Sequence, residues 1–409
     1  MANVTSDFNK APANMRLTIS FFGKRNAGKS SLVNAITGQN LSIVSDNAGT
    51  TTDPVRKAME LLPLGPVTII DTAGIDDTGE LGELRTERTA RVLKETDFAV
   101  FVTDGNPPDQ CEKEFLNNLE SLKTPYIVVI NKTDKIDIAT ELVNFLEEKN
   151  ITFVKTSVLS ETGINYLKTV IADLAKPHKQ EKTVISDRLR KSDVVLLVTP
   201  VDSSAPKGRL ILPQVQTIRD LLDAHCCTFI CQTEELENAL SALKNPPALV
   251  ITDSQVFNEV NRKLPEGIPL TSFSILFARL NGILETAVKG AEKTDSLKDG
   301  DHVLISEGCT HHRQCDDIGT VKLPFWIEEY TGKKLNFEFT SGKDFPSNPE
   351  DLKKYELVIH CGGCMLTAKE MINRMNTSGS AGVNFTNYGT IIAKMNGILE
   401  KSLEILNDR

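Results

Sequence analysis

The sequence predicts an α/β protein: an N-terminal P-loop domain, built on a mixed, mostly parallel sheet, followed by two smaller α/β domains. The chain has 409 residues, which is too long for one compact core. Short apolar runs alternate with amphipathic stretches along most of its length, and this alternation is typical of parallel strands joined by helices.

Composition limits the classes of function. The net charge of −9 disfavours a nucleic-acid partner, because such proteins usually carry a basic face. The longest apolar runs, such as Val194–Val198, are strand-sized, so we expect no membrane span. The polar residues 1–15 lack the apolar stretch of a signal peptide and predict a flexible arm of a cytoplasmic protein. Its cysteines are then expected to be reduced thiols or metal ligands.

The first domain is expected over residues 16–177. Its predicted strands are Leu17–Phe22, Val67–Ile70, Phe98–Val102, Tyr126–Ile130 and Ile151–Val154, with helices at Glu83–Glu95 and Glu112–Leu122. A lysine-rich stretch with one proline, residues 176–183, then predicts a linker.

A second α/β domain is expected over residues 178–274. Its predicted strands are Val194–Val198, Thr228–Cys231, Leu249–Thr252 and Leu270–Phe273, with helices at Gln214–Ala224 and Leu236–Leu243. The three cysteines at 226, 227 and 231 are interpreted as residues of a buried strand, and Cys111 as a cysteine at a helix start. A helix over Ile275–Val288 opens the third domain, residues 275–409, which has strands near Val303–Ile305, Leu335–Phe339 and Leu357–Ile359.

The first predicted strand is followed by the P-loop pattern G-x-x-x-x-G-K-S and then by a helix. Its glycines let backbone N–H groups turn around phosphates, and the helix N-terminus favours their negative charge. Lys29 is expected to reach the β- and γ-phosphates, and the Ser30 hydroxyl to bind Mg²⁺. The phosphate-binding residues predicted here are Gly23, Asn26, Ala27, Gly28, Lys29, Ser30 and Ser31.

Two further motifs identify the nucleotide. Asp71-Thr72-Ala73-Gly74 ends a strand, where Asp71 can hold Mg²⁺ through a water and the Gly74 N–H can meet the γ-phosphate. In Asn131-Lys132-Thr133-Asp134, the Asp134 carboxylate suits the two donors of guanine, which predicts GTP rather than ATP. Ser157 and Val158 occupy the expected place of the last base-contacting loop. The sequence thus predicts a GTP-hydrolysing enzyme.

The run Gly49-Thr50-Thr51-Thr52-Asp53 is the expected first switch. Thr51 is favoured as the Mg²⁺ ligand of the GTP state, and Thr50 and Thr52 stay open. Lys29, Thr51 and Asn26 form the predicted catalytic set. The order of motifs, with Asn26 in the phosphate loop, resembles the Era/TrmE-type GTPases. That resemblance implies that Asn26 can help place a K⁺ ion. Ile75 cannot orient the attacking water as a glutamine would, so we expect slow intrinsic hydrolysis and stimulation by K⁺.

Four of the eight cysteines and four of the six histidines fall between His302 and Cys364. Cys361 and Cys364 have the C-x-x-C spacing that suits Zn²⁺ or an iron–sulfur cluster. Cys309 and His311 form a C-x-H pair, and 48 residues separate His311 from His360. This convergence of soft ligands predicts a metal centre in the third domain.

The C-x-H…H-C-x-x-C arrangement, together with the N-terminal GTPase motifs and the three-part layout, resembles the [FeFe]-hydrogenase maturation GTPases of the HydF family. The resemblance implies a dimerising middle domain and a C-terminal [4Fe-4S] cluster. It also implies a scaffold that carries a transient two-iron precursor, works with radical-SAM maturases and serves apo-[FeFe]-hydrogenase. The implied metal residues are Cys309, His311, His360, Cys361 and Cys364, with three cysteine thiolates on the cluster and the histidines filling or flanking the fourth position.

Two alternatives stay open at this point. The first is an Era-like GTPase with a zinc-stabilised C-terminal domain that acts in ribosome or RNA biogenesis. The second is an enzyme whose cluster does redox chemistry of its own, which would need a substrate pocket in the third domain. The sequence names no residue as the fourth ligand and does not explain how GTP hydrolysis would be coupled to cluster transfer.

Overall fold

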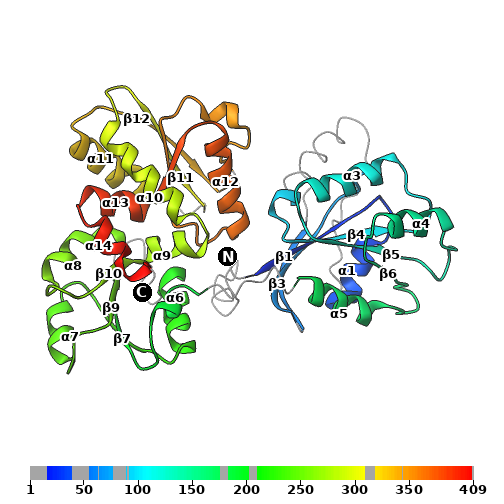
Figure 1. Cartoon of the computed structure of the whole chain (residues 1–409), viewed down its shortest axis with the longest axis horizontal. Helices are drawn as coiled ribbons and strands as arrows, with labels where there is room; N and C mark the ends of the chain where they lie inside the picture. Colours follow the sequence, from blue (N-terminus) through cyan, green and yellow to red (C-terminus); the bar gives the residue numbers. More distant parts are fainter. Residues whose placement is uncertain are drawn as a thin grey trace, which may run out of the picture. The chain divides into compact units, whose positions relative to one another are not determined.

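A computed structural model shows the fold of the protein (Figure 1). The structure describes residues 16–38, 55–62, 64–76, 89, 92–175, 183–201, 210–308, 318–342 and 344–407. The chain divides into two compact units, and the division falls between Glu181 and Lys182. The second unit contains two sheets, so the boundary expected at residues 274 and 275 falls inside it and stays a prediction. The arm expected at residues 1–15 lies outside the described residues.

The first unit is built on a six-stranded sheet of order β2-β3-β1-β4-β5-β6. The strands are β1 (Leu17–Phe22), β2 (Val55–Leu61), β3 (Gly65–Asp71), β4 (Phe98–Thr103), β5 (Tyr126–Ile130) and β6 (Phe153–Lys155). Only β2 runs antiparallel to its neighbour, β3, among these strands. The central strands β1 and β4 are buried along their whole length, as expected for parallel strands covered on both faces. The predicted mixed, mostly parallel sheet is confirmed.

The helices α1 (Lys29–Thr37), α3 (Gln110–Ser121), α4 (Thr140–Glu148) and α5 (Ile164–Ala175) cover this sheet. The apolar sides of α1 and α5 share one hydrophobic core with the sheet, and those of α3 and α4 share the core on the other face (Figure 1). The β1–α1 connection, which carries the P-loop motif, is therefore held by a buried strand and a packed helix.

The first sheet of the second unit has the order β10-β9-β7-β8, and all neighbouring strands are parallel. Its strands are β7 (Val194–Val198), β8 (Cys227–Cys231), β9 (Leu249–Thr252) and β10 (Leu270–Ser272). Its helices are α6 (Leu212–Asp223), α7 (Leu236–Ala242), α8 (Phe257–Lys263) and α9 (Phe273–Leu280). Residues of α6 and α9 pack on one face, and those of α7 and α8 on the other.

The other sheet of this unit has the order β12-β11-β13-β14 and is also parallel. Its strands are β11 (His302–Glu307), β12 (Asn336–Ser341), β13 (Leu357–His360) and β14 (Asn384–Asn387). The helices around it are α10 (Leu284–Glu292), α11 (Leu323–Thr331), α12 (Ala368–Ser380) and α13 (Tyr388–Met395), whereas α14 (Leu399–Leu403) packs against β10 of the first sheet. The two further α/β sheets predicted after the P-loop domain are therefore present.

Both four-stranded sheets have the same topology. In each, the first strand of the sheet lies between the second and the third, so the direction of winding reverses between β7 and β9 and between β11 and β13. In open parallel sheets, ligands bind outside the carboxyl ends of the strands at such a switch point. Strand β11 ends at Glu307, two residues before Cys309, and β13 ends directly before Cys361. The cysteine motif is thus divided between the two strands that flank the switch point.

One predicted helix is wrong in its extent. Residues 275–288 do not form a single helix, because α9 ends at Leu280 and α10 starts at Leu284. The chain turns at Asn281 and Gly282, and Gly282 has a φ of 74°, which suits glycine. A second prediction is also corrected: β8 is an edge strand and not a buried one, since Cys227 is exposed and Cys231 is half-buried.

Candidate functional site

The backbone of the P-loop, residues 23–30, wraps around the side chain of Lys29. Lys29 is 7% exposed, and its Nζ donates hydrogen bonds to the carbonyl oxygens of Gly23 (2.9 Å) and Lys24 (2.7 Å). Gly28, with a φ of 95°, precedes the first turn of α1. A Cβ on Gly23 would lie 2.1 Å from the carbonyl oxygen of Val102. Only glycine fits these two positions, so the loop can present its N–H groups and Lys29 to phosphate oxygens.

Two of the predicted magnesium residues are in contact. The Ser30 hydroxyl donates to Asp71 Oδ2 at 2.6 Å. Asp71 Oδ1 is buried and has no hydrogen-bond partner among the described residues. Burial raises the pKa of Asp71 above its ordinary value, although the Ser30 hydrogen bond and the Lys29 charge act in the opposite direction. An unpartnered buried carboxylate oxygen beside a hydroxyl fits a hard divalent cation such as Mg²⁺.

The predicted guanine-binding residues are tied to the P-loop. Asn131 Nδ2 donates to the Ala27 carbonyl at 3.1 Å, and Lys132 Nζ donates to the Asn26 carbonyl. The Ser157 hydroxyl donates to Asp134 Oδ1, which fixes the carboxylate that would read the base. The loops after β5 and β6 therefore meet the loop after β1, as a site for one nucleotide requires.

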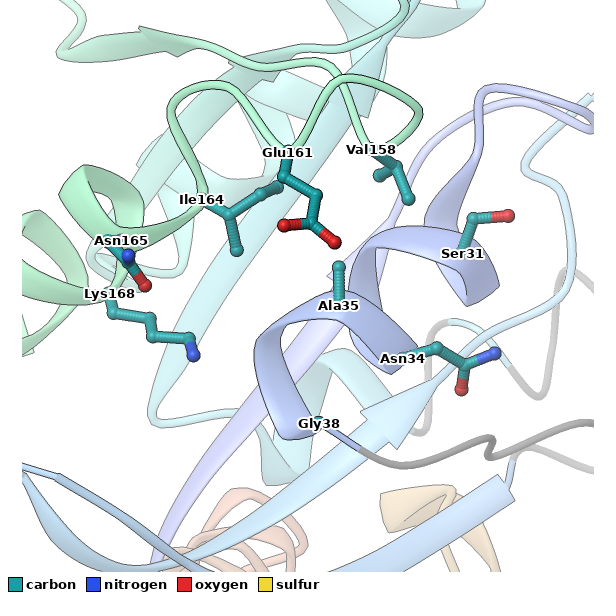
Figure 2. Close-up of a pocket in the computed structure, with 9 residues that line it drawn as sticks. All are labelled: Ser31, Asn34, Ala35, Gly38, Val158, Glu161, Ile164, Asn165 and Lys168. Carbon is teal, nitrogen blue, oxygen red and sulfur yellow. The ribbon is translucent and has the colours of Figure 1, made fainter.

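A pocket of about 620 Å³ opens between α1 and the β6–α5 region (Figure 2). Ser31 and Val158, both predicted nucleotide contacts, lie in its wall. Sequence reasoning missed the polar residues that line the rest of it, because they belong to no motif: Asn34, Glu161, Asn165 and Lys168. The pocket continues the nucleotide site along α1 and α5.

Gly74 and Ile75, which follow the β3 strand, also lie against the P-loop. A Cβ on Gly74 would approach the Arg25 nitrogen to 2.8 Å, and the Ile75 N–H donates to the Gly23 carbonyl at 3.3 Å. Cys111, expected to have no special role, donates its thiol to the Ile75 carbonyl at 3.4 Å, and burial raises its pKa. Thr51 lies outside the described residues, so its role stays a prediction.

The second candidate site is the Cys361–Cys364 loop after β13. The Gly308 N–H lies 3.1 Å from Cys361 Sγ, and the Gly363 N–H lies 3.4 Å from the same sulfur. Backbone donors of this kind stabilise a thiolate and tune an iron–sulfur cluster. Gly308 is the residue before Cys309 in the chain, so the end of β11 and the Cys361–Cys364 loop meet at this sulfur.

The loop rests on helix α9. The buried Asn281 side chain donates to the Gly362 carbonyl at 3.2 Å. Cys364 packs against the hydrophobic core that includes Phe277 of α9 and Leu221 of α6. Sequence reasoning missed Asn281, because a single asparagine at the end of a helix carries no signal.

His360 is fully buried, and both of its ring nitrogens have partners. Nδ1 lies 2.9 Å from the Cys361 carbonyl, and Nε2 lies 3.0 Å from Arg374 Nη1. Burial, with a smaller contribution from the Arg374 charge, lowers the pKa of His360 to about 3, so the ring is neutral. The prediction that His360 belongs to the metal residues stays untested, and so does that for Cys309 and His311, which lie outside the described residues. No group of three or more His, Cys, Asp or Glu side chains forms a metal site within the part of the chain that the structure describes.

Three family models match the chain in succession. Residues 18–132 match the model of a 50S ribosome-binding GTPase, residues 184–282 the hydrogen maturase F dimerization domain, and residues 285–405 the hydrogen maturase F tetramerization domain. The fold and the first site thus define a P-loop GTPase with two additional α/β domains that belong to oligomeric proteins. The chain belongs to the hydrogen maturase F (HydF) family.

Curated relatives are similar to this chain over part of its length. The tRNA modification GTPase MnmE of Oceanobacillus iheyensis is 35% identical over 162 residues, which are 38% of this chain and 34% of that protein. MnmE of Lachnoclostridium phytofermentans is 38% identical over 155 residues, 37% of this chain and 33% of the relative. The chain thus spans about a third of the length of these relatives. The shared activity in their names, GTP hydrolysis, agrees with the motifs of the first unit.

Solved structures give weaker likenesses. A probable GTP-binding protein, engB, is 27% identical with a TM-score of 0.33, and covers 39% of this chain and 99% of its own. Era of Aquifex aeolicus bound to GDP and AlF4− is 18% identical with a TM-score of 0.34, and covers 83% and 97%. Such TM-scores support no conclusion about this chain. Among the described residues, no helix has the length and apolarity needed to cross a bilayer.

Proposed function

We propose that the chain hydrolyses GTP by in-line attack of water and uses the reaction as a switch. Lys29 would neutralise the β- and γ-phosphates, while Ser30 and Asp71 would hold Mg²⁺. The contact of Ser30 with Asp71 in the structure supports this, because it brings the hydroxyl ligand and the carboxylate that would act through a water to one place, 2.6 Å apart. Thr51 would complete the magnesium shell in the GTP state.

We further propose that K⁺ stimulates this reaction. Ile75 offers no hydrogen bond to the attacking water, so hydrolysis has to rely on another group near the γ-phosphate, and a bound cation can stabilise the charge that develops there. Asn26 has a φ of 59° in the phosphate loop, an uncommon conformation that turns the chain at this position. Turnover should be faster in KCl than in NaCl, and Asn26→Ala should remove the difference. Equal rates in the two salts would refute the role of K⁺.

For the second unit, we propose a [4Fe-4S] cluster held by Cys309, Cys361 and Cys364. One observation carries this proposal: the N–H of Gly308, the residue before Cys309, lies 3.1 Å from Cys361 Sγ. Because Gly308 is bonded directly to Cys309, this contact favours a metal site shared by Cys309 and Cys361. Three thiolates on a four-iron cluster leave one iron with an exchangeable position, to which a two-iron precursor can attach.

With the HydF domains in the chain, this site supports a scaffold role in maturation of the [FeFe]-hydrogenase active site. The chain would receive the two-iron precursor through radical-SAM maturases and deliver it to apo-hydrogenase, in the cytoplasm. GTP hydrolysis would then change the affinity for these partners. A non-hydrolysable GTP analogue should alter the binding of the maturases or the apo-hydrogenase, and an unchanged affinity for all of them would contradict the switch.

The cluster proposal is tested by purifying the protein without oxygen and measuring its metals. We expect a brown protein with about four irons per chain and a cubane EPR signal after reduction. Cys361→Ser should remove most of the iron, whereas Cys111→Ser, in the first unit, should retain it. A colourless protein that contains zinc in place of iron would instead favour the zinc-stabilised alternative.

We also propose that strand β8 forms a contact between two copies of the chain. Phe229 and Ile230 are 45% and 47% exposed on this edge strand, whereas its neighbour β7 is mostly buried. An edge strand leaves N–H and C=O groups unpaired and ready to pair with another strand. The family models for dimerization and tetramerization domains agree with self-association.

A further inference from the structure

A buried pair of side chains, His360 and Arg374, lies next to the Cys361–Cys364 loop. The imidazole of His360 is 0% exposed and contacts the rings of Phe345 and Phe385, with centroid distances of 6.4 and 6.1 Å. Arg374, on helix α12, is 4% exposed. The hydrogen bond from Arg374 Nη1 to His360 Nε2 is 3.0 Å long. The pair is therefore shielded from water.

The chemistry of arginine fixes the tautomer of the histidine. A guanidinium group stays protonated and has only donors, so Nε2 of His360 must be the acceptor. The proton of a neutral imidazole is then on Nδ1, which lies 2.9 Å from the Cys361 carbonyl and donates to it. The Nε2 lone pair is occupied and Nδ1 carries a proton. In this arrangement neither nitrogen can bind a metal.

Arg374 is itself held in place by other groups. Its Nη2 donates to the Gly342 carbonyl at 2.6 Å, and its Nε donates to Glu370 Oε1 at 3.0 Å. The guanidinium lies over the ring of Phe345, 5.1 Å from the centroid. Turning Arg374 away from His360 would leave a buried charge without these partners, which costs several kcal/mol. The pair has one stable arrangement.

We propose that Arg374 is a positioning residue of the cysteine loop: it locks His360 as the Nδ1–H tautomer, and His360 holds the Cys361 carbonyl instead of binding iron. This inference rests on the proposed cluster and concerns only how its loop is built. It removes His360 from the candidates for the fourth iron ligand. It also explains why a histidine precedes Cys361: the ring closes a hydrogen-bonded turn on the residue whose sulfur accepts two N–H groups.

The tautomer of His360 can be determined in protein that carries no iron–sulfur cluster. Long-range ¹H–¹⁵N spectra of the cluster-free protein, labelled with ¹⁵N in the imidazole rings, should show one histidine as the Nδ1–H tautomer. His360→Gln should remove that signal and so assign it. If the signal lost in His360→Gln has the Nε2–H pattern, the inference is overturned. This measurement stands even if the chain takes up no iron.

The loaded protein gives the second test. Pulsed EPR of the reduced cluster should show the same ¹⁴N couplings in wild type and His360→Gln, with the same iron content. Arg374→Met should lose iron to a chelator about tenfold faster, because it removes the charged donor that holds His360 against the loop. Arg374→Lys, which keeps a charged donor, should fall in between. Lys394→Met, which breaks an ion pair with Asp295 (2.8 Å) in the same unit, is the matched control and should behave as wild type.

The outcomes separate the two proposals. Loss of a directly coordinated ¹⁴N coupling in His360→Gln, or equal iron loss from Arg374→Met and Lys394→Met, would overturn the positioning role while the cluster itself stands. Failure of the wild type to bind an iron cluster would overturn the proposed function, and the tautomer would still decide how the loop is built.

Discussion

The N–H of Gly308 lies 3.1 Å from the sulfur of Cys361, although 53 positions separate the two residues in the chain. The parallel pairing of β11 with β13 causes this approach, since Ser306 is in register with His360. Each strand delivers the residues that follow it to the same edge of the sheet. The cysteine motif is therefore a consequence of strand register, and changes to its glycines should have position-specific effects.

The two glycines between Cys361 and Cys364 are predicted to differ. Gly363 has a φ of 65°, and a Cβ there would lie 2.5 Å from Met371 Sδ. Gly363→Ala should therefore lower stability by about 1–2 kcal/mol from the backbone alone and disturb the loop. At Gly362 the closest atom to a Cβ would be Ser274 Oγ at 3.7 Å, an ordinary contact. Gly362→Ala should keep its iron, and Gly363→Ala should lose much of it. Equal iron contents in the two variants would contradict this reading of the loop.

Asp71→Asn is predicted to stabilise the nucleotide-free protein while abolishing magnesium-dependent nucleotide binding. Because burial raises the pKa of Asp71 in the folded state, ionising this carboxyl at neutral pH costs free energy. Wild-type stability relative to Asp71→Asn should be greatest below the ordinary aspartate pKa and should fall as the pH rises through the raised value. Chemical denaturation from acid to neutral pH without Mg²⁺ or nucleotide measures the difference. A variant that is less stable than wild type at neutral pH would refute the prediction.

Asp134→Asn is predicted to change the nucleotide preference. The carboxylate accepts from two donors of guanine, and its loss should weaken GTP binding by about 10- to 100-fold. An asparagine can donate to the extra carbonyl of xanthine, so binding of xanthosine triphosphate should improve. Isothermal titration with both nucleotides tests this, with Asp137→Asn, another exposed carboxylate on the same loop, as the control. Unchanged GTP affinity in Asp134→Asn would show that the base is read elsewhere.

Phe229→Lys on strand β8 is predicted to weaken self-association. A lysine on an edge strand opposes pairing with a second strand because its charge would have to be desolvated. Sedimentation should show a dissociation constant raised by about tenfold or more, equivalent to about 1.4 kcal/mol. Leu159→Lys, at a position 75% exposed in the first unit, serves as the control. If both variants associate as the wild type does, the contact lies on another surface.

Local sequence signals accounted for most of the fold. The predicted strands β1, β5, β7 and β9 have the bounds seen in the structure, because continuous apolar runs mark central parallel strands. Strand β2 was not predicted, since only its last residue is buried and its pattern is weak. Strand β14, N-F-T-N, has one apolar residue and is a strand because β13 pairs with it and α10 packs against it. Tertiary contacts, and not the local sequence, make these two segments strands.

For the two candidate sites too, some residues could be predicted from the sequence and others depended on tertiary contacts. Motif residues such as Lys29, Ser30 and Asp71 were predictable because fixed spacing and a strand–loop–helix context define them. Arg374 and Asn281 were not, since their importance depends on which carbonyl or ring nitrogen each one meets after folding. The geometry also gives His360 a second interpretation, as a support for the loop, that spacing alone could not suggest. Supporting residues are specified by three-dimensional contacts and leave no pattern in the chain.

The packing of Cys364 has a consequence for the second unit. Cys364 lies in the loop that follows β13 of one sheet, and its half-buried side chain packs against the hydrophobic core of the other sheet, which includes Phe277 and Leu221. A ligand bound to that sulfur would connect the two sheets of the second unit. A chain with nothing bound to that sulfur would lack this link between the sheets.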